Sequence, residues 1–222
     1  MNRAKRTQLR RRRDRGSQDW GVINQILDAG FIAHVGFCVN RQPFVIPTVY
    51  GRNKRTLYLH GSVASRMLRE LDTEIEACVS VTLVDGLVLS RSAFDHSMNY
   101  RSVVAFGKAR AITDPEQKVD SLRILSNHLI AGRWADVRAP NDEELNATSV
   151  LEFLVEEASA KIRSGPPQDD KSDFEWAVWA GVLPLEMRSL PPIPDGNLVK
   201  GVAIPDYVVN YDARLTRGPA NL

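Results

Sequence analysis

Between residues 31 and 112 the chain is a close succession of short apolar, β-branched runs separated by brief turns. Parallel strands need crossover connections of about a dozen residues or more, and most of these turns are far shorter. The pattern therefore predicts an antiparallel meander or Greek key that closes into a barrel. The expected strands of this stretch are 31–39, 44–50, 56–60, 77–84 with 87–90, and 101–112; further strands are expected at 150–156 and 176–185.

Residues that favour the start of a helix occur before and between these strands. Ser17 and Ser62 are candidate N-caps, for helices over 17–30 and 62–71. Asp114-Pro115-Glu116 places proline at the first helical position after a capping acid, which predicts a helix to about residue 130. Asn141-x-x-Glu144 has the form of a capping box. We predict a basic arm at residues 1–16, a single domain at 17–190 and an extended tail at 191–222.

The arm is strongly basic and contains a single acid, Asp14. Its cations are Arg3, Lys5, Arg6, Arg10, Arg11, Arg12, Arg13 and Arg15. Such an arm can bind nucleic acid or acidic lipid through phosphate contacts. It has no aromatic residue for base stacking, however, and the net charge of the whole chain is only +2. We therefore favour a solvated arm, or one that packs on acidic groups of its own protein, and do not expect nucleic-acid binding.

The remaining composition is that of a globular protein with one sizeable core, with 43% hydrophobic and 25% charged residues in 222. No apolar run has the length of a membrane helix, and no secretory signal is seen, so we expect a cytoplasmic protein without membrane contact. Cys38 and Cys78 lie in apolar runs and are expected to be buried and reduced. The histidines are too scattered to predict a zinc site, and no metal site is expected.

The stretch 57–71 has the features of an anion site, because a strand stops at Gly61 and leads into a capped helix. Free backbone N–H groups and the helix dipole favour an anion at such a start. Ser62 and Ser65 add hydroxyl groups, and the guanidinium of Arg66 can hold phosphate oxygens. A plain N-capped helix with a surface arginine explains the same residues equally well.

Other polar segments carry weaker signals. Ser97 to Ser102 offers donors and acceptors suited to a planar heterocycle, but a turn followed by an edge strand would look the same. Lys161 and Arg163 share one face of a strand, which points either into a cleft or to solvent. Trp179 either covers a flat cofactor or fills the core.

Taken in order, several motifs resemble the FMN-binding split-barrel family that includes the pyridoxamine 5′-phosphate oxidases, and most closely its flavin-nucleotide-binding subgroup related to nitroimidazole-resistance proteins. The resemblance implies a mainly β (α+β) fold, a six-stranded antiparallel split β-barrel with flanking helices, which forms a homodimer with FMN at the subunit interface. The motifs are His34-Val35-Gly36-Phe37, Gln42 to Thr48, Leu57 to Ser62 with Ser65-Arg66, Asp85 to Leu89, Ser97 to Val103, Ala158 to Lys161 and Trp179 to Pro184.

The same resemblance implies a set of cofactor-binding residues. Along the isoalloxazine ring it implies Val45, Ile46, Pro47, Thr48, Val49 and Tyr50. At the ribityl chain and phosphate it implies His60, Gly61, Ser62, Ser65 and Arg66. On neighbouring strands it implies Asn99, Tyr100, Arg101, Ser102 and Lys161, with Trp179 beside the ring, either from the same subunit or from its partner.

The resemblance has two departures. The Arg-x-His that holds substrate in vitamin B6 oxidases is replaced by Met187-Arg188-Ser189, which puts that activity in doubt. Before Ser97 the chain has Asp95-His96, whereas the subgroup often has two histidines.

The leading hypothesis is an FMN-dependent oxidoreductase that acts on a small organic substrate. Lys161 or Arg101 would stabilise the reduced ring, and His60 and His96 are the candidate catalytic proton donors, although structural hydrogen bonding would explain both histidines. The alternatives are a non-catalytic flavin carrier or sensor, a haem- or deazaflavin-binding variant of the same barrel, and a nucleic-acid-binding protein that uses residues 3 to 15.

Overall fold

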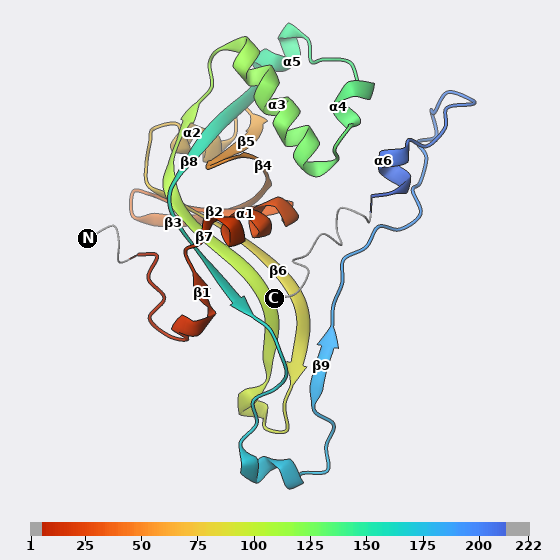
Figure 1. The fold of residues 1–222 in the computed structure, drawn as a ribbon. Coiled ribbons are helices and arrows are strands. Elements are labelled where there is room, and N and C mark those ends of the chain that lie inside the picture. The colour runs from red at the N-terminus through yellow and green to blue at the C-terminus, as the bar shows by residue number, and fades with distance from the viewer. Residues whose placement is uncertain (1–5, 212–222) are drawn as a thin grey trace.

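The computed structural model describes residues 6–211, which form an elongated molecule with a barrel-like upper part and a narrow lower part (Figure 1). One sheet of nine strands runs through both parts in the order β3-β2-β6-β7-β8-β5-β4, with β1 beside β8 and β9 beside β6. Every strand pairing is antiparallel. The predicted mainly β architecture is confirmed, and the sheet remains open because β3 and β4 are its free edges.

The strands are longer at the centre of the sheet than the sequence suggested. Residues 51–53 form a strand where a turn was expected, and residues 176–180 lie outside the last strand. The strands are β1 (Gly16–Ser17), β2 (Ile32–Val39), β3 (Gln42–Val49), β4 (Gly51–Asn53), β5 (Thr56–Ser62), β6 (Ala77–Leu89), β7 (Ser97–Ala111), β8 (Thr148–Arg163) and β9 (Gly181–Pro184).

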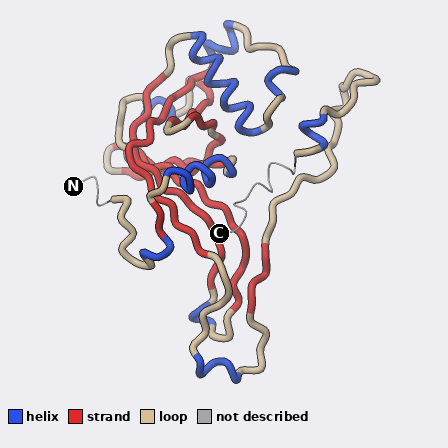
Figure 2. Tube along the Cα trace, in the orientation of Figure 1, coloured by secondary structure: helices blue, strands red, loops and turns tan. Residues whose placement is uncertain are grey.

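The helices gather around the upper part, and Figure 2 shows them in blue against the red strands. The α-helices are α1 (Trp20–Ala29), α2 (Arg66–Leu71), α3 (Pro115–Leu129), α4 (Arg133–Asp136), α5 (Asp142–Ala147) and α6 (Asp206–Val209). Short 3₁₀ turns are η2 (Arg13–Arg15), η3 (Ala93–Asp95) and η4 (Lys171–Glu175). The expected extended tail therefore contains one short helix, α6.

Two of the expected helix starts are confirmed and two are wrong. The Asp114 side chain accepts a hydrogen bond from the Gln117 amide at 2.8 Å, and Asn141 with Glu144 forms the predicted capping box. The first helix, however, is capped by Asp19 rather than Ser17. Ser62 remains in β5 opposite Thr148, so α2 starts only at Arg66.

The lower part is a stalk, which we define as residues 83–102 and 159–187. Here β6, β7 and β8 continue beyond the barrel as a narrow ribbon, and β9 returns along β6 (Figure 1). The register of β6 against β7 shifts between Val84 and Gly86, which leaves Asp85 in a bulge. A bulged residue leaves the regular ladder and can aim its side chain at a neighbouring strand.

The core lies in the upper part, between the inner face of the sheet and the helices α1 and α2. Tyr50 is fully buried, and its hydroxyl donates a hydrogen bond to the Leu27 carbonyl of α1 at 2.5 Å. Cys78 is half-buried and Cys38 is exposed, so the prediction of burial is wrong for Cys38, which faces outward on β2. Among residues 6–211, no helix is long and apolar enough to span a membrane.

Arg6 of the basic arm packs on acidic side chains of its own protein. Arg6 forms ion pairs with Glu76 at 2.6 Å, Glu157 at 3.3 Å and Glu156 at 3.6 Å. Its guanidinium also stands over the Phe106 ring, 4.8 Å from the centroid. Packing on acidic groups of the same protein, one of the two explanations given for the arm, is therefore confirmed at Arg6. Arg3 and Lys5 lie outside the described residues.

Candidate cofactor-binding site

The first group of expected cofactor residues lies on the edge strand β3. Pro47 pairs with His34, and the free edge explains how a strand can accept a proline, which has no amide hydrogen to donate. Val45 is 67% exposed, whereas Tyr50, just beyond the strand, is completely buried. The outer face of β3 is thus open to a ligand, but the Tyr50 side chain points into the core.

The expected phosphate segment lies beside β3. The guanidinium of Arg66 stands over the Phe44 ring of β3, 5.5 Å from its centroid. Within residues 6–211 no acidic partner is recorded for Arg66, so its charge is available to an anion. Ser65 precedes α2 without a side-chain capping bond, which leaves its hydroxyl free for a ligand.

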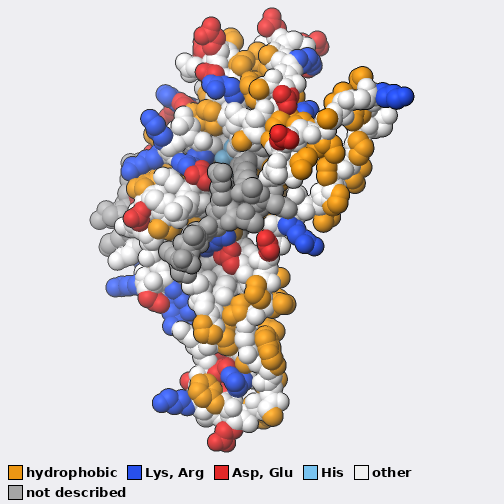
Figure 3. Space-filling model, turned by 45° about the vertical axis from the view of Figure 1, so that its right-hand side comes forward, with side chains coloured by type: hydrophobic (Ala, Val, Ile, Leu, Met, Phe, Trp, Pro, Cys, Tyr) orange, Lys and Arg blue, Asp and Glu red, His pale blue; other side chains and the backbone are white. Residues whose placement is uncertain are grey.

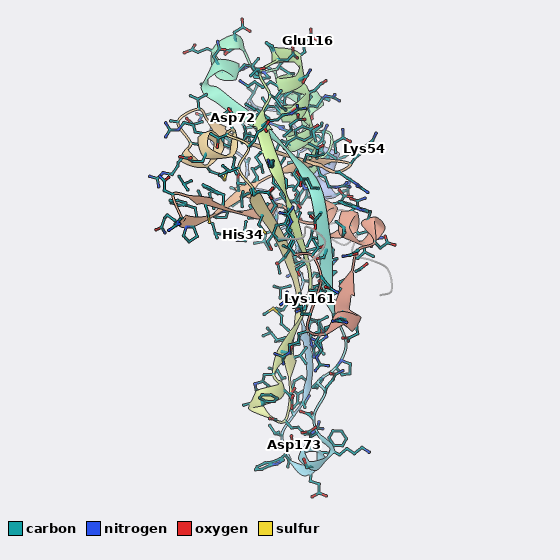
Figure 4. The ribbon with its side chains drawn as sticks, turned by 90° about the vertical axis from the view of Figure 1, so that its left-hand side faces the viewer. His34, Lys54, Asp72, Glu116, Lys161 and Asp173 are labelled. Atoms are coloured by element: carbon teal, nitrogen blue, oxygen red, sulfur yellow. The ribbon has the colours of Figure 1, made fainter. Side chains whose placement is uncertain are left out.

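A second group of expected residues lies on the stalk. Ser102 and Lys161 are cross-strand partners, and the Ser102 hydroxyl donates to the Lys161 carbonyl at 3.4 Å. Figure 4 shows Lys161 between the barrel, where His34 lies, and the lower tip, where Asp173 lies. No ion pair is recorded for the Lys161 amine in the described part of the chain, so this cation is also available.

Arg101, the other candidate cation for the flavin ring, is already paired. Its guanidinium binds both carboxylate oxygens of Asp85, with Nη2 to Oδ1 at 2.6 Å and Nε to Oδ2 at 2.9 Å. The bulge in β6 aims Asp85 at β7, where Arg101 lies opposite Leu83. Sequence reasoning missed this partner, although an Asp-Gly pair within a long β run is a signal for a bulge.

Asn99 is buried and holds the loop at the end of β8. Its amide donates to the Gly165 carbonyl at 3.2 Å, and its side-chain oxygen accepts from Arg163. Arg163 is 5% exposed, so it does not face solvent, and burial lowers its pKa. Tyr100 is half-buried opposite Arg163. Asn99 and Arg163 therefore have structural partners within the stalk.

The two histidines expected as proton donors lie far apart within one protomer. His60 pairs with Val150 of β8, and the next residue of β8 lies opposite the last residue of β7. His96, in contrast, directly precedes the first residue of β7. The two histidines therefore lie at opposite ends of β7. The 15 residues of β7 span about 45 Å. His96 contacts the Ser90 carbonyl at 3.1 Å in the turn between β6 and β7, and His60 faces the helices of the upper part.

Trp179 lies next to β9 on the stalk and is 65% exposed. It is one of several apolar side chains exposed there, and Figure 3 shows hydrophobic surface both along the stalk and over the C-terminal segment. The expected cofactor residues thus form two groups in one protomer. Val45 to Val49 with Ser62 to Arg66 lie in the upper part, and Asn99 to Ser102 with Lys161 and Trp179 lie on the stalk.

The family and fold of the chain follow from its likeness to known proteins. Residues 19–162 match the model of the pyridoxamine 5′-phosphate oxidase family. The chain belongs to this family. No curated protein matches it, and among solved structures several matches are found.

Two of these structures resemble this family member over nearly its whole length. A flavocytochrome from Azotobacter vinelandii is 38% identical, with a TM-score of 0.87, and the match covers 93% of this chain and 96% of that one. An FAD and haem binding protein from Mycobacterium smegmatis is 33% identical, with a TM-score of 0.84 and coverage of 88% and 96%. A nitroimidazole antibiotic resistance protein from Bacteroides thetaiotaomicron shares the fold at 24% identity, with a TM-score of 0.55 and coverage of 66% and 86%.

Proposed function

We propose that this protein is a redox protein that binds both a flavin and a haem. The observation that carries the proposal is the full-length likeness to a flavocytochrome and to an FAD and haem binding protein, at 38% and 33% identity. Both likenesses extend well beyond the family match at residues 19–162, because they take in 93% and 88% of the chain.

The residues of the candidate site fit a flavin. A flavin nucleotide presents an anionic phosphate and, when reduced, a ring that carries negative charge, so it needs cations that are not already neutralised. Arg66 beside β3 and Lys161 on the stalk meet this condition, whereas Arg101 is bound to Asp85. We assign Arg66 to the phosphate and Lys161 to the ring, and the flavin would supply the electron-transfer chemistry.

This assignment requires two subunits, because Arg66 and Lys161 lie in different parts of one protomer (Figures 1 and 4). The solvent-accessible surface area of the chain is 14530 Å², whereas a compact monomer of its mass has about 10,200 Å². A stable dimer interface buries about 1,200–2,000 Å² in total, which is less than the surface that this chain exposes beyond that of a compact monomer. We infer a homodimer in which the stalk of one subunit lies beside β3 of the other. Exposed apolar side chains available for it are Phe174, Trp176, Trp179, Leu183 and Met187.

We also propose which flavin is bound and whether the protein acts on a substrate. The family resemblance favours FMN, whereas the Mycobacterium smegmatis relative is an FAD binding protein, and we favour FAD because that relative is similar over nearly the whole chain. We further propose an oxidoreductase that acts on a small molecule rather than a passive carrier, since a second redox cofactor would let the protein pass electrons on. Vitamin B6 oxidase activity is not proposed, because Met187-Arg188-Ser189 replaces the substrate-binding Arg-x-His.

The test is to purify the protein and identify what it holds. We expect absorption bands of both a flavin and a haem, with the released nucleotide identified as FAD by its mass and one equivalent of each cofactor per chain. Apoprotein should regain both on incubation with FAD and haemin. A protein that binds neither cofactor after such incubation would overturn the proposal. Consumption of NAD(P)H or of a nitro compound would separate an enzyme from a carrier.

A further inference from the structure

The upper part contains a cavity of about 520 Å³ between the sheet and the helices α3 to α5, which is within the range of a cofactor pocket. One side is a single face of α3, formed by Leu122, Leu125, Ser126 and Leu129 at helical spacing. Trp134 of α4 and Pro140 add further apolar surface. Arg138 and Glu144 are the only charged residues among those that line it, and they form an ion pair at 2.5 Å.

His60 is the residue that the sheet contributes to this cavity. Leu57 and Leu59 of β5 point into the barrel core and are fully buried, so the alternation of the strand turns His60 to the opposite face, toward α3. Among residues 6–211 its Nδ1 atom has no hydrogen-bond partner and is completely covered, so Nε2 is the ring nitrogen that is left to face the cavity. A buried imidazole nitrogen without a partner is unusual and calls for an explanation.

A histidine that projects from a rigid strand into an apolar cavity has the features of a proximal haem ligand.

We propose that this cavity holds the haem and that His60 is the axial ligand of its iron. The inference rests on the proposed function, which makes haem a second cofactor, and it adds where in this chain the haem lies. The cavity suits a flavin poorly, because Glu144 already neutralises the only cation that lines it. A largely apolar macrocycle fits the leucine face and Trp134.

The assignment also separates two roles that the sequence had placed together. The family resemblance assigned His60 to the flavin along with Arg66. In the structure Arg66 stands over Phe44 of β3, while His60 lines the cavity under α3. The two side chains therefore serve different cofactors.

The experiment compares His60→Ala with Asn53→Ala, which truncates an exposed side chain of β4, at the sheet edge opposite β3, and serves as the control. Each full-length protein is incubated with FAD and haemin, and haem affinity, haem absorption and bound flavin are measured. We expect His60→Ala to bind haem at least tenfold more weakly while it keeps its flavin, and added imidazole to restore part of the haem spectrum. Asn53→Ala should behave like the wild type.

A second variant guards against loss of the fold. His60→Met keeps a side chain of similar length with a sulfur that can bind haem iron, so we expect retained haem with a shifted absorption spectrum. If His60→Ala and His60→Met both bind haem with wild-type affinity and spectrum, this inference is overturned while the proposed function stands. A wild-type protein that binds flavin but no haem overturns the inference together with the haem part of the proposed function.

Discussion

Replacing Arg66 by alanine should weaken flavin binding far more than it weakens the fold. In residues 6–211 the only contact recorded for this guanidinium is the half-buried Phe44 ring at 5.5 Å, and a cation over the ring at such a surface site contributes about 0.5–1 kcal/mol. For a chain of this size, we therefore expect Arg66→Ala to lower the melting temperature by about 4 °C at most.

The effect on the flavin should be larger, because a phosphate held by this guanidinium makes charge-assisted hydrogen bonds. Each such bond contributes about 1.5–3 kcal/mol, which corresponds to roughly 10- to 150-fold in the dissociation constant. No carboxylate is recorded beside Arg66 in residues 6–211, so no internal ion pair offsets the loss.

The assay is titration of flavin-free protein with FAD and FMN, followed by quenching of flavin fluorescence. Arg69→Ala is the matched control, because Arg69 is an exposed arginine of the same helix. Arg66→Lys should fall between the wild type and Arg66→Ala, since an ammonium keeps the charge but loses the bidentate geometry. A dissociation constant within twofold of the wild type for Arg66→Ala, or an equal loss for Arg69→Ala, would refute the assignment.

Three further perturbations test other parts of the structure. Tyr50→Phe removes the buried hydrogen bond to Leu27 and should lower the free energy of unfolding by about 1–2 kcal/mol in chemical denaturation, with unchanged flavin affinity; weaker flavin binding at unchanged stability would instead make Tyr50 a cofactor contact. The Arg138 hydrogen bond lowers the pKa of Glu144 from 4.5 to about 2, so the stabilisation by this pair should be complete above pH 4.5 and be lost as the pH falls toward 2. NMR titration should show the Glu144 midpoint move back toward 4.5 in Arg138→Gln, and an unmoved midpoint would contradict the pairing. Trp179→Ala should raise the dimer dissociation constant nearly 1,000-fold in sedimentation experiments, because a symmetric interface loses two copies of a hot-spot residue that contributes about 2 kcal/mol each; a monomeric wild type would contradict the dimer.

Features set by neighbouring residues could be predicted from the sequence. The start of α3 at Asp114-Pro115 and the capping box of Asn141 with Glu144 depend only on side chains within one helical turn. Pro47 is compatible with the edge position of β3, because proline has no amide hydrogen for a second partner strand. The start of α2 was wrong because Ser62 pairs with Thr148, a contact between residues far apart in the chain.

In the candidate site, too, the sequence indicates what depends on neighbouring residues but not what depends on residues far apart in the chain. Residue types that suit a flavin could be found, but whether each cation is available depends on partners from other strands. Asp85 neutralises Arg101 through a bulge whose position depends on the pairing of β6 with β7, while Arg66 and Lys161 stay available. The cavity beside His60 is lined from β5, α3 and the segment around α4 and α5, so no single stretch of sequence indicates it.

The segment β5–α2 connects the two proposed cofactor sites, and this makes the two sets of variants a test of each other. Arg66 follows His60 by six positions, so their Cα atoms are at most roughly 22 Å apart. A local distortion of this segment would disturb both sites together. If His60→Ala loses haem but keeps flavin, and Arg66→Ala loses flavin affinity but keeps haem, distortion cannot explain either result. The chemistry of each side chain then remains as the cause, since the two residues share a segment but face different surroundings.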